Sequence, residues 1–311
     1  MKKFFKILCV NFLSVALILL FFDVLIWICH NINLKERFKS EPVFYEYSKN
    51  YSLPRPYFRK LCHSVDNREE KRTPSGLSFK KPPIIVFGCS FAYGSYLEDE
   101  QTFSYKLSKL TKRPVYNEAF PGQGVQHMLY LLQNPEFYKK EEPEYCIYLY
   151  MSDHIRRLYA PTCSNFDILD GTYNLIYKEK KGKLVLDKIG NDIVSYIKMS
   201  YLSQFLIHLY LNKFYLKNEK NQRNIAKYFI ESKNEAKKHW KNTKFIVIIY
   251  DKIQQGEYIK SELEKNDIKM IYMKDLTKER LSKRKYSFPD THPKEKAWDL
   301  LTPLVVKELN L

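Results

Sequence analysis

A serine follows the first strongly apolar run in the carboxyl-terminal three quarters of the chain. Ile84 to Gly94 reads IIVFGCSFAYG, in which four apolar residues predict a short buried strand and Gly88 predicts its end. Ser90 comes two residues later. In an α/β protein, a side chain just beyond the carboxyl end of a central strand lies where ligands bind. Two interpretations are open: Ser90 is a nucleophile, or it only caps the helix that follows.

The next segment with a helical pattern is Asp99 to Lys112. Its amino end would direct backbone N–H groups and a partial positive charge towards whatever Ser90 holds. Such donors favour a reaction in which negative charge develops on oxygen. A nucleophilic Ser90 therefore requires a base and further oxyanion donors elsewhere in the chain.

Two polar blocks follow other predicted strands. NEAFPGQG, residues 117–124, contains Gly122, whose backbone N–H can approach a ligand closely because glycine has no Cβ. YMSDHIRR, residues 150–157, places Ser152, Asp153 and His154 directly after a run that we expect to be buried. The alternatives are a Pro-Gly turn in the first block and a helix N-cap in the second.

A third polar block precedes the last predicted helix. FPDTHPKEKAW, residues 288–298, contains Asp290 and His292, with Pro293 at the start of the helix. A carboxylate two residues from a histidine can fix the tautomer of the imidazole, as a general base requires. The alternative is an ordinary capped helix start.

From Pro82 onwards, predicted strands and helices alternate along the chain, and the polar blocks lie between them. The alternation predicts parallel strands covered by helices on both faces, hence a three-layer α/β/α sandwich with a five-stranded flavodoxin-like sheet. The predicted strands are Ile84–Phe87, Val115–Asn117, Tyr145–Tyr150, Lys244–Tyr250 and Ile268–Met273. The predicted helices are Asp99–Lys112, Gly124–Tyr138, Ile193–Leu216, Asn221–Lys241, Ile253–Asn266 and Lys294–Leu309.

The region near 163–217 interrupts this alternation. Phe166 to Leu186 carries Asp170-Gly171 and Lys181-Gly182 turn pairs between β-rich runs and predicts an inserted hairpin. The helix predicted over Ile193–Leu216 is apolar nearly all round. It is either buried between the insert and the sheet or lies on a membrane surface.

The amino-terminal part has a different composition. Ile7 to Cys29 is almost continuously apolar, and at about 1.5 Å per residue it is long enough to cross a bilayer core of ~30 Å. No small-residue cleavage site follows it, so we expect an uncleaved anchor. The predicted organisation is a short tail at 1–6, a transmembrane anchor at 7–29, a juxtamembrane spacer at 30–81 and the α/β domain at 82–311.

Charge and cysteine content restrict the class of protein. The 311 residues include 45% hydrophobic residues and carry a net charge of +17. No zinc-finger or RNA-recognition signature accompanies the charge, so we expect no nucleic-acid partner. The six cysteines include no Cys-x-x-Cys pair. Their spacing therefore does not match a metal-binding motif. The sequence does not decide whether Cys62 and Cys163 form a disulfide in an oxidising compartment.

From Ile84 onwards the blocks resemble those of the SGNH/GDSL hydrolase family. GCSF, with Ser90, stands where the family has Gly-Asp-Ser and implies that Ser90 is the nucleophile. NEAFPG resembles the block in which a glycine five residues after an asparagine supplies an oxyanion N–H, here Gly122. DTHP resembles the last block, which implies Asp290 as the orienting acid and His292 as the general base.

The sequence departs from the family pattern at two positions. Cys89 stands where the family has an aspartate before the nucleophile, a side chain that does not react. The family's Gly-x-Asn-Asp block aligns Asp153 with its aspartate, which puts Ser152 at the place of the asparagine. The resemblance therefore implies Ser152 as the third oxyanion donor, with His154 as the alternative.

The resemblance implies a serine esterase or acyltransferase that forms an acyl-enzyme on Ser90 and needs no metal or organic cofactor. The expected substrate is an O-acyl group of a cell-envelope glycan, or otherwise a lipid ester. The expected location is the cell membrane, with a single span and the catalytic domain on the extracytoplasmic, periplasmic side. The alternative function is a non-catalytic envelope protein that binds a glycan or a partner through a degenerate hydrolase fold. The sequence predicts no oligomeric state.

Overall fold

A computed structural model describes most of the chain from residue 81 onwards. The described residues are 12, 14–26, 28–29, 81–135, 137, 141–158, 175–189, 218–250, 256–289 and 291–311. The predicted spacer, the Asp170-Gly171 turn, the helix predicted over Ile193–Leu216 and Asp290 lie outside them.

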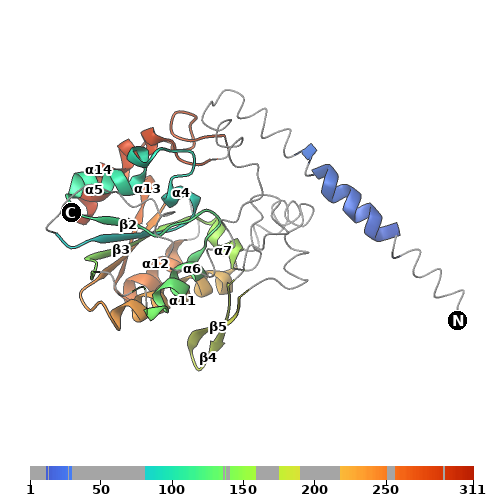
Figure 1. The fold of residues 1–311 in the computed structure, drawn as a ribbon, viewed down its shortest axis with the longest axis horizontal. Coiled ribbons are helices and arrows are strands. Elements are labelled where there is room, and N and C mark those ends of the chain that lie inside the picture. The colour runs from blue at the N-terminus through green and yellow to red at the C-terminus, as the bar shows by residue number, and fades with distance from the viewer. Residues whose placement is uncertain are drawn as a thin grey trace, which may run out of the picture.

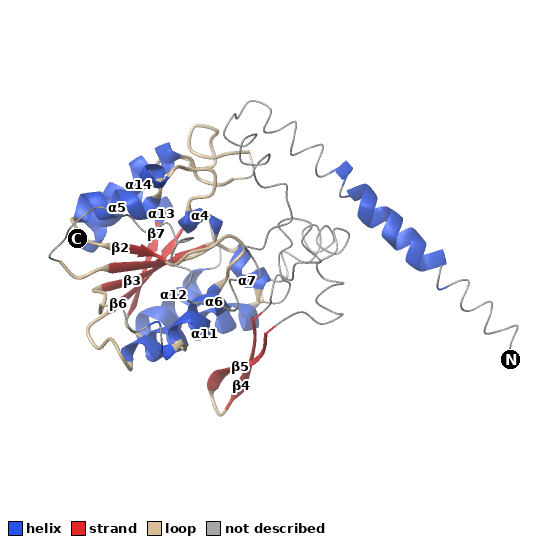
Figure 2. Ribbon diagram, viewed as in Figure 1, coloured by secondary structure: helices blue, strands red, loops and turns tan. Residues whose placement is uncertain are grey.

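A five-stranded parallel sheet forms the centre of the domain (Figures 1 and 2). Its strands run in the order β2-β1-β3-β6-β7, the flavodoxin-like order. β1 lies between β2 and β3, so the residues that follow β1 leave the sheet near its middle. The strands are β1 (Ile84–Phe87), β2 (Val115–Asn117), β3 (Tyr145–Tyr150), β6 (Lys244–Ile249) and β7 (Ile268–Tyr272). The parallel sheet predicted from the sequence is confirmed.

One face of the sheet packs against three helices. They are α6 (Val125–Leu132), α11 (Glu219–Lys237) and α12 (Gly256–Lys265). Their apolar side chains share a buried core with every second residue of the strands, such as Ile85, Phe87 and Tyr148. Because strand side chains alternate between faces, the remaining strand residues point to the other layer.

The other face packs against α4 (Ser90–Tyr93), α5 (Phe103–Thr111), α13 (Met273–Leu276) and α14 (Glu295–Leu309) (Figure 2). Trp298 of α14 is fully buried, with its ring 5.3 Å from that of Phe103 on α5. This contact fixes the start of α14, and therefore the segment that precedes it, against the sheet.

The helix predicted over Asp99–Lys112 is divided in the structure. Asp99–Gln101 is a short 3-10 turn, and Thr102 has an extended backbone that ends it. Thr102 then caps α5, because its side-chain oxygen accepts the N–H of Tyr105 at 3.3 Å. The helix that begins at Ser90 is instead α4, whose four residues show no helical periodicity in the sequence.

The inserted hairpin and a short helix complete the described domain. β4 (Leu175–Lys180) and β5 (Lys183–Ile189) pair antiparallel, and Lys181 and Gly182 both have positive φ between them. This matches the turn predicted at Lys181-Gly182. α7 (Asp153–Arg157) follows β3.

The described residues between Phe12 and Cys29 are helical. Most of their apolar side chains are exposed, among them Phe12, Leu20 and Phe21. Within the part of the chain that the structure describes, no helix combines the length and the apolar character that a membrane span requires.

Candidate active site

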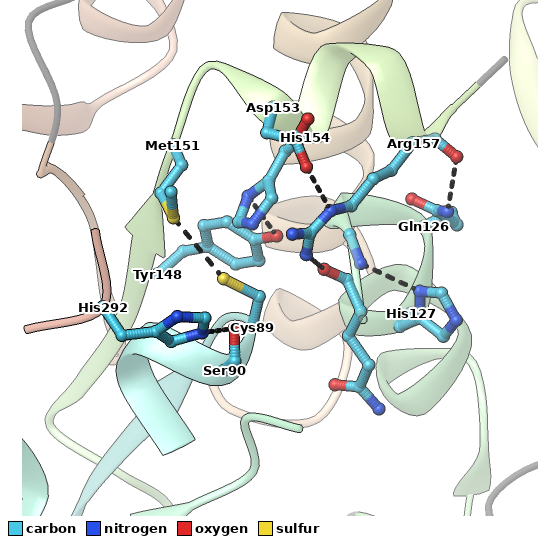
Figure 3. A network of polar contacts seen from close by, with 12 residues as sticks. Cys89, Ser90, Gln126, His127, Tyr148, Met151, Asp153, His154, Arg157 and His292 are labelled. Carbon is cyan, nitrogen blue, oxygen red and sulfur yellow. Dashed lines mark hydrogen bonds and ion pairs between the residues drawn. The ribbon is translucent and has the colours of Figure 1, made fainter. Parts of the chain in front are cut away.

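Two of the residues singled out in the sequence meet at the carboxyl end of β1. Nε2 of His292 lies 2.8 Å from Oγ of Ser90, across 202 residues of sequence (Figure 3). Ser90 is 8% exposed, and His292 is half-buried. A serine hydroxyl hydrogen-bonded to an imidazole is the arrangement in which the imidazole can remove the hydroxyl proton.

Gly88 sets the position of Ser90. Its φ is +153°, and a Cβ at this position would lie 2.8 Å from Cβ of Ala92 and 3.1 Å from the carbonyl oxygen of Leu149. The chain can therefore turn from β1 directly into α4 only because residue 88 has no side chain. Ser90 is the first residue of α4. The turn places it at the edge of the sheet where the strands end.

The backbone before α14 sets the position of His292. Phe288 N–H donates to the carbonyl of His292 at 2.8 Å, and Lys294 N–H donates to the carbonyl of Tyr286 at 2.8 Å. These two bonds make a narrow antiparallel bridge centred on Ser287 and Pro293. The bridge fixes the backbone on both sides of the histidine.

Aromatic rings fix the imidazole itself. The ring of His292 lies 4.8 Å from that of Phe91 and 5.1 Å from that of Tyr96. Tyr96 also contacts Phe288 edge-on at 5.4 Å and has a positive φ of 70°. Packing of this kind restricts the ring to few orientations, as a positioned base requires. Asp290 lies outside the described residues, so its role as orienting acid stays a prediction.

The NEAFPGQG loop is tied to the turn that carries Ser90. Asn117 is fully buried; its Nδ2 donates to the carbonyl of Ala92 at 3.1 Å, and its Oδ1 accepts the N–H of Ala119 at 3.2 Å. Phe120 N–H donates to the carbonyl of Gly88 at 3.3 Å. Asn117 therefore braces the loop against α4, a role that sequence reasoning missed because its partner is 25 residues away.

Gly122 lies at the outer turn of this loop. Its φ is +82°, and no atom lies within 4 Å of the place where a Cβ would be. Gln123 N–H closes the turn by donating to the carbonyl of Phe120 at 3.2 Å. The glycine is thus required by its backbone conformation rather than by crowding, and the position that a side chain would occupy is open.

Ser152 lies in the turn between β3 and α7. The residue before it, Met151, has its sulfur 3.6 Å from Sγ of Cys89, the neighbour of Ser90. This contact brings the end of β3 next to the start of α4. The role of Ser152 as an oxyanion donor stays a prediction.

His154 does not take the position that the sequence suggested as an alternative. The ring is fully buried, and Nδ1 lies 3.0 Å from the hydroxyl of Tyr148. It also meets the rings of Tyr148 and Tyr150 edge-on at 5.5 Å, on the face of the sheet that α11 covers. Burial, and then the positive charge of Arg157, hold the pKa of His154 well below its usual value. His154 is therefore a neutral core residue, and the hypothesis that it donates to an oxyanion needs correction.

A buried arginine completes the site and was not among the candidates from the sequence. Arg157 Nε donates to Oδ2 of Asp153 at 2.9 Å, and one of its terminal nitrogens donates to the carbonyl of Gln123 at 2.6 Å (Figure 3). The Asp–Arg spacing of four residues is the signal that could have identified the ion pair. The contact with Gln123 joins α7 to the NEAFPGQG loop.

The arrangement suits nucleophilic chemistry at Ser90. A positioned imidazole faces the serine hydroxyl, and a braced loop with a glycine amide lies next to the turn that carries the serine. Among the described residues, no group of three or more His, Cys, Asp or Glu side chains is placed to hold a metal ion.

Comparisons with known proteins identify similar structures and no sequence relative. No protein-family model matches the chain, and no curated protein matches its sequence. An acetyl xylan esterase from Butyrivibrio proteoclasticus is similar at a TM-score of 0.47 and 11% identity over 75% of this chain and 64% of the esterase. The chain thus spans less than two thirds of that esterase's length.

Two further solved structures show the same range of similarity. A family two carbohydrate esterase from Clostridium thermocellum matches at a TM-score of 0.44 and 7% identity, over 76% of this chain and 66% of the esterase. A member of the lipolytic protein G-D-S-L family from Veillonella parvula matches at 0.44 and 13% identity, over 73% of this chain and 98% of that protein. These three structures are described as an acetyl xylan esterase, a family two carbohydrate esterase and a lipolytic protein of the G-D-S-L family.

Proposed function

We propose that this protein is a serine esterase or acyltransferase that cleaves acyl esters through an acyl-enzyme on Ser90. The observation that carries the proposal is the 2.8 Å contact between Oγ of Ser90 and Nε2 of His292. Two residues so far apart in the chain meet at the ligand-binding edge of a parallel sheet, with the histidine packed between aromatic rings.

In the first half of the reaction, Nε2 of His292 takes the proton of the Ser90 hydroxyl while Oγ bonds to the ester carbonyl carbon. The carbonyl oxygen becomes an oxyanion, for which the backbone N–H groups of Ser90 and Gly122 and the side chain of Ser152 are the proposed donors. The intermediate then expels the alcohol, which receives the proton from His292. The acyl group remains on Ser90.

In the second half, water or a sugar hydroxyl gives its proton to His292 and attacks the acyl-enzyme. The carbonyl–Oγ bond breaks, and Oγ recovers its proton. Water as the acceptor makes the protein an esterase, whereas a sugar hydroxyl makes it an acyltransferase. Asp290 is the proposed partner that orients His292 and stabilises its protonated form.

The proposed substrate is an O-acyl group of a cell-envelope glycan, with a lipid ester as the second choice. Half-buried aromatic rings border the nucleophile: Tyr93 lies in α4 with its ring 5.5 Å from that of Phe120, and Tyr96 packs on His292. Flat apolar ring faces with a polar edge suit binding sites that hold a ligand with both apolar and polar surface, such as a sugar.

Labelling with a fluorophosphonate tests the catalytic assignment. The probe should form an Oγ–phosphorus bond at Ser90 with loss of fluoride, and Ser90→Ala should abolish it. His292→Ala should label far more slowly, and ester turnover of the double variant should be scarcely lower than that of either single variant, because nucleophile and base act as a unit. Ser95→Ala is the matched control, since Ser95 is buried in the same segment and should leave labelling unchanged.

The alternative function predicts a different result. A non-catalytic envelope protein with a degenerate site would bind a glycan and give no Ser90-dependent labelling. Labelling that maps to another serine, or that is indifferent to His292, would refute the catalytic assignment and leave the binding protein in its place.

We also propose that Ile7–Cys29 anchors the chain in the cell membrane with residues 82–311 outside the cytoplasm. The proposal rests on the length and apolarity of that segment. Protease added to intact spheroplasts should degrade the domain. Protection in intact spheroplasts followed by degradation after lysis would reverse the orientation.

A further inference from the structure

Arg157 connects two parts of the site that are 34 residues apart in sequence. Its side chain is 10% exposed, and it donates both to the Asp153 carboxylate and to the carbonyl of Gln123. The backbone of Arg157 is also held, because Nε2 of Gln126, on the first turn of α6, donates to the Arg157 carbonyl at 3.2 Å. The arginine is thus held from both ends in a single geometry (Figure 3).

The contact with Gln123 acts on the segment that carries Gly122. Phe120 is fixed to the end of β1 through its N–H bond to Gly88, and it accepts the N–H of Gln123. The Gln123 carbonyl is then held by Arg157. Gly122 lies between these two fixed residues, in a backbone conformation that the loop must maintain. A shift of the Gln123 carbonyl would rotate the peptide groups on either side of Gly122.

We propose that Arg157 is a positioning residue that orients the amide of Gly122 for the oxyanion by holding the carbonyl of Gln123. The inference rests on the proposed function of the same site. Arg157 acts through Gln123 and does not itself touch the substrate. The role requires arginine, because a planar guanidinium can donate to a carboxylate and to a carbonyl in fixed directions, which a lysine ammonium on its flexible stem cannot do.

A second buried arginine, Arg113, has the same kinds of partner, and within the described part of the chain those partners lie away from the site. Arg113 is also 10% exposed; it pairs with the Glu144 carboxylate and donates to the carbonyl of Pro82 at 3.2 Å. Its partners precede β1 and β3, and Arg113 itself precedes β2, so this cluster lies at the amino edge of the sheet. Arg113→Lys is therefore a matched control for the general cost of replacing a buried arginine.

The test compares the full-length wild type with Arg157→Lys and Arg113→Lys, using p-nitrophenyl acetate as substrate. Turnover is expressed per active site, counted by the fluorophosphonate reaction carried to completion. We expect Arg157→Lys to lower kcat about 10- to 100-fold with KM changed by less than about threefold, because a misplaced donor stabilises the transition state less. Arg113→Lys should lower the melting temperature to a similar extent and leave kcat within about twofold.

A boronic acid provides a readout that a merely structural role would not change. Its tetrahedral adduct with Ser90 places an oxygen at the oxyanion position, so its inhibition constant should rise in Arg157→Lys by about the same factor as kcat falls. If Arg157→Lys does not fold, Asp153→Asn replaces it, since this change removes the negative charge that holds one side of the guanidinium and should lower kcat about 3- to 10-fold at constant KM.

The outcomes separate this inference from the proposed function. Absence of Ser90-dependent turnover in the wild type would refute the proposed function itself. Ser90-dependent turnover in the wild type, combined with an unchanged kcat and boronic acid affinity in the folded variants of Arg157 or Asp153, would overturn the positioning role alone.

Discussion

Replacing Gly88 by alanine should destabilise the domain far more than the same change at Gly122. Both glycines have positive φ, which costs an alanine about 1 to 3 kcal/mol of folding free energy. At Gly88 the added Cβ would also lie 2.8 Å from Ala92 and 3.1 Å from the Leu149 carbonyl, and such overpacking costs a further ~1 to 3 kcal/mol. At Gly122 no atom lies within 4 Å, so only the backbone cost remains. The expected losses are about 2 to 6 kcal/mol for Gly88→Ala and about 1 to 3 kcal/mol for Gly122→Ala.

Urea unfolding of the purified full-length proteins, followed by circular dichroism, measures both losses on one scale. Ester turnover per folded molecule, measured below the transition, separates stability from activity. Gly122→Ala should remain folded and lose turnover, since its methyl group would occupy the open space beside the loop whose Gly122 N–H is the proposed oxyanion donor. Equal losses of stability in the two variants, or a smaller loss at Gly88, would refute the steric account of the turn that positions Ser90.

Three other changes test separate parts of the structure. Ser152→Ala should lower kcat by roughly 100-fold, the size expected for one oxyanion donor, whereas near-normal turnover would show that the backbone N–H groups suffice. The free energy of unfolding should fall as the pH drops from 7 to 5. The buried His154 has a pKa well below its usual value in the folded state and stays neutral, whereas in the unfolded chain it takes up a proton near pH 6.5. One such histidine accounts for about 2 kcal/mol of unfolding free energy over this range. Burial also lowers the pKa of His127 to about 4, which adds to the same trend, and His154→Gln should flatten the pH dependence measured by urea unfolding. Tyr96→Ala should lower kcat about tenfold with a smaller effect on KM, since the ring that packs on the imidazole of His292, the proposed base, would be lost; steady-state kinetics that match the wild type would contradict this role.

The strands were predictable because each is a short, uninterrupted apolar run. Ile84–Phe87 is buried on both faces, so it shows no alternation, and the same holds for Tyr145–Tyr150. A parallel sheet brings the carboxyl ends of its strands to one edge, and the resemblance of the GCSF and DTHP blocks implied that His292 meets Ser90 there, which the 2.8 Å contact shows.

The parts that could not be predicted depend on tertiary contacts. Four residues are too few for a helical period, so α4 left no pattern in the sequence. The direction of the His154 ring is set by its contact with Tyr148 and by the helical layer packed on that face of the sheet. The polar sequence after Tyr150 does not show which face of the sheet its side chains will take. The contact of Arg157 with Gln123 joins two loops whose proximity follows only from the finished fold.

The separation of 202 residues between Ser90 and His292 has a consequence for the newly made chain. The serine emerges with β1, whereas the histidine is delivered by the segment before α14, after all five strands of the sheet have been synthesised. Closing a chain segment of this length is entropically costly and slow unless the intervening strands have already paired. An unfolded or half-assembled chain therefore holds an ordinary, inert alcohol at position 90. Reactivity appears only at the end of folding, so the rate at which a refolding sample gains fluorophosphonate reactivity reports when the whole sheet is complete.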